Sequence, residues 1–152
     1  YNSRGLAHYH QGDYDQAIAD YDQAIELDPE YAAAYFNRGD VYDEKDDYDQ
    51  AIADYDQAIE LDPEFAGAYH NRGMAYLLFK HDYDQAIADC SQAIELDPEY
   101  VSAYYIRAFA YYGKGDKHQA LADFEMCLAL GATGAVKEIA EEKIGELRQL
   151  SE

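Results

Sequence analysis

An 18-residue segment that recurs at a fixed spacing constrains this chain more than any other feature. DYDQAIADYDQAIELDPE occupies residues 13–30 and returns letter for letter at 47–64, and a third copy at 82–99 differs only at Cys90 and Ser91. The copies begin 34 and then 35 residues apart. Self-similarity at such a period is typical of stacked structural repeats, so we expect an array in which each unit packs on its neighbours.

Each period predicts two helices joined by a polar turn. In the second period, apolar and small residues follow helical spacing in two runs, namely Tyr35, Arg38, Gly39 and Tyr42, then Ala51, Ile52, Tyr55, Ala58, Ile59 and Leu61. Asp47 is placed to cap the second helix, and Pro63 disfavours helical geometry in the residue before it. The extra residue of the third period lies within 78–81, where we expect a longer turn. No strand signal is found, which predicts an all-α fold.

The repeats resemble the tetratricopeptide repeat. The resemblance rests on an aromatic residue, Gly and Tyr in the first helix, Ala and an aromatic residue in the second, and a proline after it, at a 34-residue period. It implies a right-handed α-solenoid formed as a single domain over 1–152, with repeats at about 1–31, 32–65, 66–100 and 101–132. Tyr stands where the family usually has Trp, His8 stands where the other units have Tyr, and Ala108 replaces Gly in the fourth unit.

A capping helix is predicted at about 134–150. Gly131 can end the preceding helix in left-handed geometry, and one face of the following segment carries Val136, Ile139, Ala140, Ile144, Leu147 and Leu150. A solenoid needs such an end element because an open repeat exposes the surface meant for a neighbour. Nothing equivalent stands before Tyr1, so we expect that repeats precede it in a longer chain or that this end stacks on another molecule.

Charged residues recur with the repeat and predict ion pairs between helices. An arginine occupies the same place in each first helix (Arg4, Arg38, Arg72, Arg107), and an aspartate recurs in each second helix (Asp20, Asp54, Asp89, Asp123). The family consensus has Leu at the arginine position, so a charge there needs a partner. We predict Arg–Asp pairs within a unit or across adjacent units.

The net charge of −21 excludes a nucleic-acid-binding surface, because phosphate recognition needs clustered Lys and Arg and the chain has 11 of them against 32 acidic residues. No apolar run is long enough to predict a membrane span. Of the charged residues, 24 acidic and 5 basic ones lie in residues 1–99. The acidic excess favours either a solvated outer face or an electrostatic field that attracts a basic partner.

No arrangement of residues predicts catalysis, a cofactor or a metal. The histidines are scattered, the acidic run 43–49 lacks the Gly and the distal Glu of a calcium loop, and the carboxylates recur with the scaffold. Cys90 and Cys127 form neither a metal-ligand spacing nor a disulfide framework, and we interpret them as buried thiols. We therefore predict a protein that is not an enzyme.

The resemblance implies a concave groove, lined by the first helices, in which tetratricopeptide arrays usually bind peptides. The residues that this pattern places in the groove are Tyr9, Phe36, Asn37, Asp40, Asp43, Glu44, His70, Asn71, Met74, Leu77, Tyr105, Phe109 and Tyr112. They vary between units while the scaffold positions repeat, which fits a specific binding surface as well as drift on an unused one. We expect the apolar members to be exposed and to bind a partner.

Two family comparisons refine this expectation. Chaperone-binding members hold a terminal carboxylate with a clamp of Lys, Asn and Arg, and the corresponding positions here contain no Lys or Arg, so we predict no binding to the acidic tails of heat-shock chaperones. Members with an asparagine ladder bond a peptide backbone, and Asn37 and Asn71 match two positions of such a ladder.

We therefore expect a non-catalytic module that binds a peptide or helical segment of a protein partner, with Asp40, Asp43 and Glu44 selecting a basic flank. The alternative is a structural scaffold that self-associates through the ends of its repeats. The sequence leaves the compartment open, with the cytoplasm as the default because no targeting segment is visible.

Overall fold

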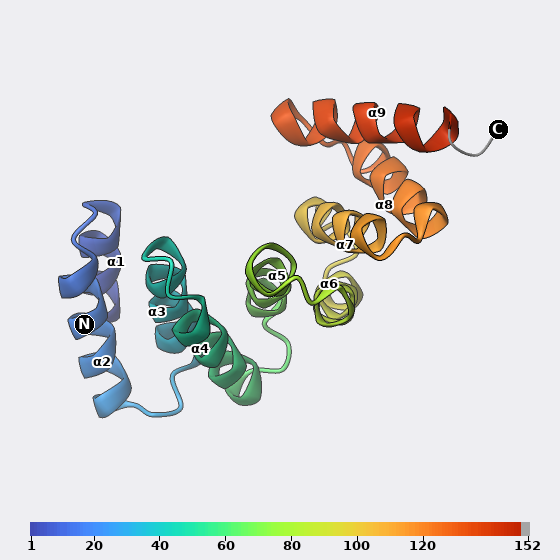
Figure 1. Cartoon of the computed structure of the whole chain (residues 1–152). Coiled ribbons are helices and arrows are strands. Elements are labelled where there is room, and N and C mark those ends of the chain that lie inside the picture. The colour runs from blue at the N-terminus through green and yellow to red at the C-terminus, as the bar shows by residue number, and fades with distance from the viewer. Residues whose placement is uncertain (150–152) are drawn as a thin grey trace. The chain divides into compact units, whose positions relative to one another are not determined.

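The computed structural model describes residues 1–149, and every regular element in that range is helical, so the predicted all-α fold is confirmed (Figure 1). The described residues form two compact units, Tyr1–Ala75 and the residues from Tyr76 onward. The first contains α1 (Asn2–His10), α2 (Tyr14–Leu27), α3 (Ala32–Glu44), α4 (Tyr48–Leu61) and α5 (Ala66–Ala75). The second contains η1 (Tyr76–Lys80), α6 (Tyr83–Leu96), α7 (Val101–Lys114), α8 (Lys117–Ala129) and α9 (Gly134–Gln149). Within each unit, successive helices pack on one another, as expected for an α-solenoid.

The turn inside each repeat has a central residue in the left-handed region in all four copies and the same closing hydrogen bond in three of them. The residue at its centre has a positive φ, and it is Gly12, Asp46, His81 and Gly115 in turn. In three repeats the N–H of the following aspartate donates to the carbonyl five residues earlier, at 2.9 Å. This closes the first helix as in a Schellman motif and leaves the aspartate in place to start the second helix. Two repeats thus hold a non-glycine residue in the left-handed region.

We had expected the extra residue of the third repeat to lengthen the turn, but it does not. It is taken up inside the helix, where α5 continues into the single π-helical turn η1. The N–H of Asp82 consequently donates to Tyr76 O, six residues earlier rather than five, at 3.0 Å. A π turn absorbs one additional residue without breaking the helix, so the sequence position of the insertion was correct and its form was wrong.

The second helices begin and end at the predicted residues. The aspartate before each one accepts a hydrogen bond from the backbone N–H three residues later, as a side-chain N-cap does (Asp13, Asp47, Asp82 and Asp116). In each Asp-Pro-Glu sequence the aspartate side chain accepts from the N–H of the glutamate two residues later, at 3.0–3.2 Å. The chain therefore turns at fixed points and delivers the next first helix in register.

Small residues let the two helices of a repeat approach closely. The side chain of Tyr55 lies against Gly39, where an added Cβ would be 2.8 Å from the tyrosine Cε1, and Ala51 on the same helix is fully buried. Gly5 has the same relation to Tyr21. The recurrent Gly and Ala positions are thus explained by packing.

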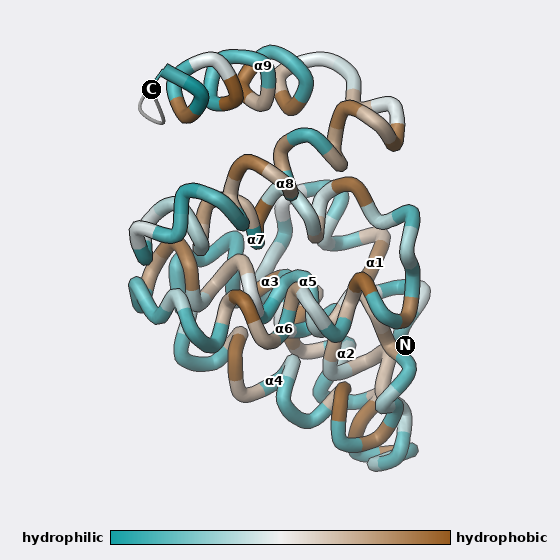
Figure 2. The backbone as a smooth tube through the Cα atoms, turned by 90° about the vertical axis from the view of Figure 1, so that its right-hand side faces the viewer, coloured by the Kyte–Doolittle hydropathy of each residue, from teal (hydrophilic) through white to brown (hydrophobic). Residues whose placement is uncertain are grey.

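The predicted capping helix is α9, which packs on α8. Its buried residues Ala140, Ile144 and Leu147 join a core cluster with Phe124 of α8, while hydrophilic residues alternate with them along the helix (Figure 2). Gly131 has the expected positive φ. Leu150, which we had placed on the same face, lies outside the described residues. One side of α9 thus completes the core of the fourth repeat.

Candidate functional site

Three carboxylates of α3 form the most distinctive polar cluster in the first unit. Asp40, Asp43 and Glu44 are spaced i, i+3 and i+4, which places them on one face of the helix. The oxygen Oδ1 of Asp40 accepts two hydrogen bonds, from Tyr55 Oη at 2.9 Å and from Asn71 Nδ2 at 2.8 Å. We call Asp40, Asp43 and Glu44 the acidic site. Because its donors come from α4 and α5, the site is fixed by three helices.

Burial makes the charges of the acidic site costly. The pKa of Asp40 is raised to about 6, mainly because the carboxylate is removed from water. The hydrogen bonds from Tyr55 and Asn71 lower this pKa, whereas the negative charges of Asp43 and Glu44 raise it. Burial also raises the pKa of Asp43, whose Oδ1 atom is buried and accepts no hydrogen bond. The hydroxyl of Tyr9 on α1 approaches Glu44 Oε1 at 3.5 Å, and the pKa of Tyr9 is raised to about 12, first by burial and then by this acidic neighbour.

The acidic site has no cationic partner within residues 1–149. The nearest lysine in sequence, Lys45, instead donates to Asp15 of α2 at 2.7 Å. The carboxylates of the acidic site can therefore accept hydrogen bonds from an added cation.

Three of the four aspartates that we expected to pair with arginines are paired as predicted. Arg38 donates through Nε and Nη2 to the two oxygens of Asp54, at 2.8 and 2.6 Å, and Arg107 holds Asp123 in the same fork at 2.8 Å. Arg4 makes the equivalent pair with Asp20. These three pairs are confirmed, whereas the fourth, Arg72 with Asp89, would join the two units and stays a prediction.

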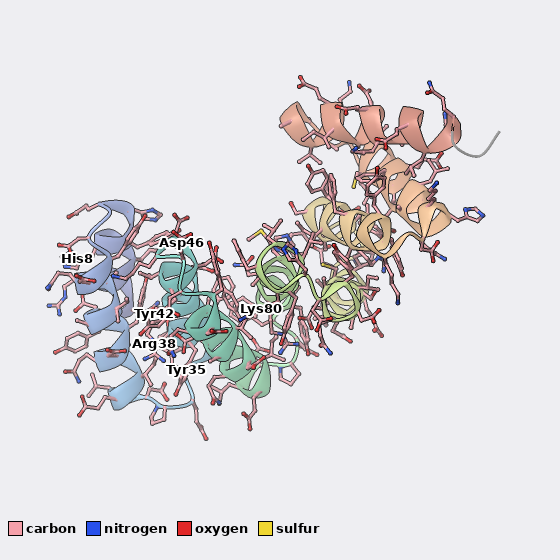
Figure 3. The ribbon with its side chains drawn as sticks, in the orientation of Figure 1. His8, Tyr35, Arg38, Tyr42, Asp46 and Lys80 are labelled. Atoms are coloured by element: carbon pink, nitrogen blue, oxygen red, sulfur yellow. The ribbon has the colours of Figure 1, made fainter. Side chains whose placement is uncertain are left out.

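Each internal arginine also reaches back to the preceding second helix, which the repeat pattern alone did not specify. Arg38 Nη1 donates to Asp22 at 2.6 Å, Arg72 Nη1 to Asp56 at 2.6 Å, and Arg107 Nη1 to Ser91 Oγ at 3.0 Å. In Figure 3 the labelled Tyr35, Arg38 and Tyr42 lie on the side of α3 that faces α2. The Arg38 guanidinium lies 5.6 Å from the centre of the Tyr35 ring, and an equivalent Tyr–Arg contact recurs in each of the four repeats. The tyrosine three residues before each arginine is a sequence signal from which this arrangement could have been predicted.

The two predicted ladder asparagines are engaged within the first unit. Asn37 Nδ2 donates to Asn2 Oδ1 at 3.0 Å, linking α3 to α1, and Asn71 bonds Asp40 as described above. His70 Nδ1 contacts Asn71 Oδ1 at 2.9 Å, and burial lowers the pKa of His70. These side chains tie neighbouring first helices together, which accounts for the recurrent asparagines without a ligand.

The apolar residues predicted for the groove are more buried than expected. Leu77 lies in the π turn and is only 8% exposed, so its placement as an exposed surface residue is wrong, while the neighbouring Leu78 is 50% exposed. Phe36 is half-buried against Phe65, with ring centroids 4.6 Å apart, and Met74 is also half-buried.

In the second unit, Tyr105, Phe109 and Tyr112 pack in part against the core cluster around Phe124. The hydroxyl of Tyr112 also donates to Glu146 of α9 at 2.6 Å. Their aromatic faces therefore serve the core first, and they do not form the fully exposed apolar patch that we expected.

Both cysteines are fully buried, as predicted. Burial raises the pKa of Cys90 to about 12 and that of Cys127 to about 11, so neither is a reactive thiolate near neutral pH. Within the described residues, no group of three or more His, Cys, Asp or Glu side chains has a metal-binding arrangement, and no helix has the length and apolarity needed to span a bilayer.

Comparison with known proteins agrees with the repeat geometry. Family profiles described as tetratricopeptide repeat match residues 2–66, 54–88 and 102–130, and a profile described as TPR repeat matches 80–115. The chain belongs to the tetratricopeptide repeat family. The human tetratricopeptide repeat protein 6 is 45% identical over 40 residues, a match that covers 26% of this chain and 8% of that protein. The chain thus spans a small part of this relative.

Solved structures of tetratricopeptide proteins superpose well on the chain. MamA is 25% identical with a TM-score of 0.87, over 97% of this chain and 84% of MamA. The second TPR domain of human RPAP3, in complex with the HSP70 peptide SGPTIEEVD, is 32% identical with a TM-score of 0.68, over 75% of this chain and 92% of that domain. The first TPR domain of Spaghetti (RPAP3), bound to the HSP90 peptide SRMEEVD, is 27% identical with a TM-score of 0.72, over 78% and 91%.

Proposed function

We propose that this tetratricopeptide chain is a protein-interaction module that binds a partner segment through a basic side chain at the acidic site. The general role is that of the similar TPR domains, which are bound to peptides in their structures. The basic selectivity is specific to this chain. It rests on one observation, the half-buried carboxylates of Asp40 and Asp43, which have no cation beside them within residues 1–149.

The contrast with the scaffold aspartates supports this proposal. Asp20, Asp54 and Asp123 are buried and each receives an arginine, so their charges are compensated inside the fold. The acidic site carries three carboxylates on one helical face without such compensation, at a cost to stability. Groups kept in an unfavourable ionisation environment are typical of functional sites, where the ligand supplies the missing charge.

The geometry indicates what the ligand must offer. A lysine or arginine side chain entering beside α3 can donate to the exposed carboxylate of Glu44 and to Asp43, which is only half-buried. Tyr9, whose hydroxyl lies near Glu44, adds an aromatic ring at the edge of the site. Arginine fits best because its planar fork can bond a carboxylate through two parallel hydrogen bonds.

The test uses fluorescent peptides that carry two arginines and matched peptides with neutral citrulline in their place. We expect the arginine peptides to bind and Asp40→Asn with Asp43→Asn to weaken them about tenfold or more, since a charge-assisted hydrogen bond contributes about 1.5–3 kcal/mol. The control is Glu138→Gln with Glu142→Gln, which removes the same charge from two exposed positions of α9. Equal weakening by both double variants would show that only the overall field acts and would refute selection by the acidic site.

The alternative of a scaffold that self-associates through the repeat ends receives less support. End-to-end stacking needs an uncovered second helix at one end, and α9 packs over α8 in the second unit. Sedimentation over a concentration series separates the two ideas, because a chain that stays monomeric at high concentration cannot be such a scaffold.

A further inference from the structure

Two phenylalanine rings and a glycine form an apolar surface next to the acidic site. Phe36 of α3 and Phe65, which directly precedes α5, lie with their ring centroids 4.6 Å apart, and Gly67 in the first turn of α5 lies beside both rings. Both phenylalanines and the glycine are half-buried, so part of this surface is open to solvent. We call Phe36, Phe65 and Gly67 the phenylalanine site.

Gly67 is not required by packing, unlike the glycine in the middle of α3. At Gly39 an added Cβ would lie 2.8 Å from a tyrosine ring, so a larger residue cannot fit there without a shift. At Gly67 the nearest atoms would lie 3.4 Å away in Phe65 and 3.6 Å away in Phe36, which is ordinary van der Waals contact. An alanine would therefore fit, and it would favour the helix. The equivalent positions of two other repeats do carry a side chain, in Ala33 and Ser102. The glycine thus leaves room for at least a methyl group beside the two aromatic rings.

Tyr55 connects the phenylalanine site to the acidic site. The centroid of its ring lies 5.9 Å from that of Phe36, and its hydroxyl donates to Asp40 Oδ1 at 2.9 Å. Phe36 and Asp40 are four residues apart on α3, so they share one face of the helix. The acidic site continues this face towards the C-terminal end of α3. The two sites are therefore contiguous, with an apolar end at Phe36 and an anionic end at Glu44, and both lie within the first unit.

From this geometry we propose that the phenylalanine site binds a large apolar side chain of the same partner segment whose arginine binds at the acidic site. The inference rests on the proposed function and adds a second requirement to it. Glu44 follows Phe36 by eight positions, which is about 12 Å along the helix axis. An extended segment advances about 3.3 Å per residue, and its residues four apart point to the same side. The partner segment therefore carries a leucine, or a residue of similar size, four residues from its arginine.

Charge favours a basic segment over a second copy of this chain as the occupant. The phenylalanine site adjoins three carboxylates, and the chain has 32 acidic residues against 11 basic ones. An approaching copy would bring like charge to the acidic site, whereas a segment with a net positive charge is attracted to it. The apolar residue then supplies contact area that the carboxylates lack.

The test uses fluorescent Gly-Ser peptides that each carry one arginine and one leucine. The separation of the two residues is varied, in both orders along the peptide, and matched peptides have Leu→Ala or citrulline in place of arginine. We expect the tightest binding at a separation of four residues, and we expect Leu→Ala to weaken it about fivefold or more, because a partly buried leucine gains part of its free energy of transfer from water.

A protein variant tests where the leucine binds. Gly67→Ala fills the space beside the rings with a methyl group, so in this variant the Leu→Ala change in the peptide should weaken binding less than about twofold, since little apolar area is left for the leucine to cover. The control is Ser102→Ala, at the equivalent position of α7, in which the effect of Leu→Ala should be the same as in the parent protein.

The outcomes separate this inference from the proposed function. If citrulline weakens binding but Leu→Ala does not, or if Leu→Ala has the same effect in the parent and in Gly67→Ala, the phenylalanine site does not bind the segment and only the proposed function stands. If the arginine and citrulline peptides bind alike, the proposed function fails and this inference fails with it. A monomer–dimer equilibrium of the chain alone in sedimentation, weakened by Gly67→Ala, would show that a second copy occupies the site instead.

Discussion

Arg38 provides a stability test in which one guanidinium serves both the variant and its control. It bonds Asp54, whose side chain is 8% exposed, and Asp22, whose side chain is 54% exposed. Asp54→Asn and Asp22→Asn remove the same charge at nearly the same volume from two partners of one arginine. Any effect of net charge therefore cancels between them, and the remaining difference reports burial and geometry.

The two losses should differ severalfold. Breaking a buried ion pair costs about 3–5 kcal/mol because the remaining charge is left uncompensated. Arg38 is not fully buried and keeps Asp22 at 2.6 Å, so for Asp54→Asn we expect about 2–4 kcal/mol. For Asp22→Asn we expect less than about 1 kcal/mol, as for other exposed pairs.

The measurement is urea unfolding followed by far-UV circular dichroism, with the slope compared between variants. A third variant adds Arg38→Leu to Asp54→Asn. Because this change removes the uncompensated charge, it should recover part of the unfolding free energy that Asp54→Asn loses. Equal losses for Asp54→Asn and Asp22→Asn, or no recovery with Arg38→Leu, would refute the reasoning.

Three further predictions concern the turns, the acidic site and ligand choice. His81→Gly should stabilise the chain by about 0.5–1 kcal/mol, since its left-handed φ of 53° strains any residue with a Cβ, whereas Gly115→Ala at the same turn position should destabilise it; urea midpoints decide this. Asp40 has a raised pKa of about 6, so the folded state binds its proton more tightly than the unfolded chain and the associated stability is present below about pH 4 and lost as the pH rises through 6. Asp40→Asn, which keeps an oxygen for Tyr55 and Asn71, should therefore be more stable than the parent above pH 6 and lose that advantage at pH 4, and a pH-independent difference would contradict it. Finally, calorimetric titration with SRMEEVD should give no measurable binding, because the peptide's acidic end would meet the acidic site, and a salt-sensitive complex would contradict this.

Most of the fold could be predicted from the repeat period. It fixed the helix pairs, the aspartate caps and three Arg–Asp pairs, since each of these recurs at the same place and needs only local rules and a neighbouring copy. The π turn was missed because one extra residue can lengthen a loop or widen a helix at similar cost, and the choice depends on how the neighbouring helices pack.

The candidate site was only partly accessible from the sequence. The repeat pattern selected Asp40, Asp43 and Glu44 because they differ from their equivalents in other units, but it could not show that Asp40 is buried. Its hydrogen-bond donors, the hydroxyl of Tyr55 and the amide of Asn71, belong to two other helices, so the environment of Asp40 depends on tertiary packing. Leu77 was also misplaced: it is buried in the π turn, an element that the sequence did not predict.

The arginine that spans two second helices also governs how the array melts. In a one-dimensional array of repeats, the cooperativity of unfolding depends on the interaction free energy between neighbouring repeats. Each arginine contact of this kind adds to that interaction free energy. The arginine bonds a carboxylate, Asp22, between α2 and α3, but a neutral hydroxyl, Ser91, between α6 and α7. The interaction free energy between α6 and α7 should therefore be smaller and less sensitive to salt. Hydrogen exchange at low salt should therefore find a lower opening free energy for the joint between α6 and α7 than for the joint between α2 and α3, and the two should converge as salt is added.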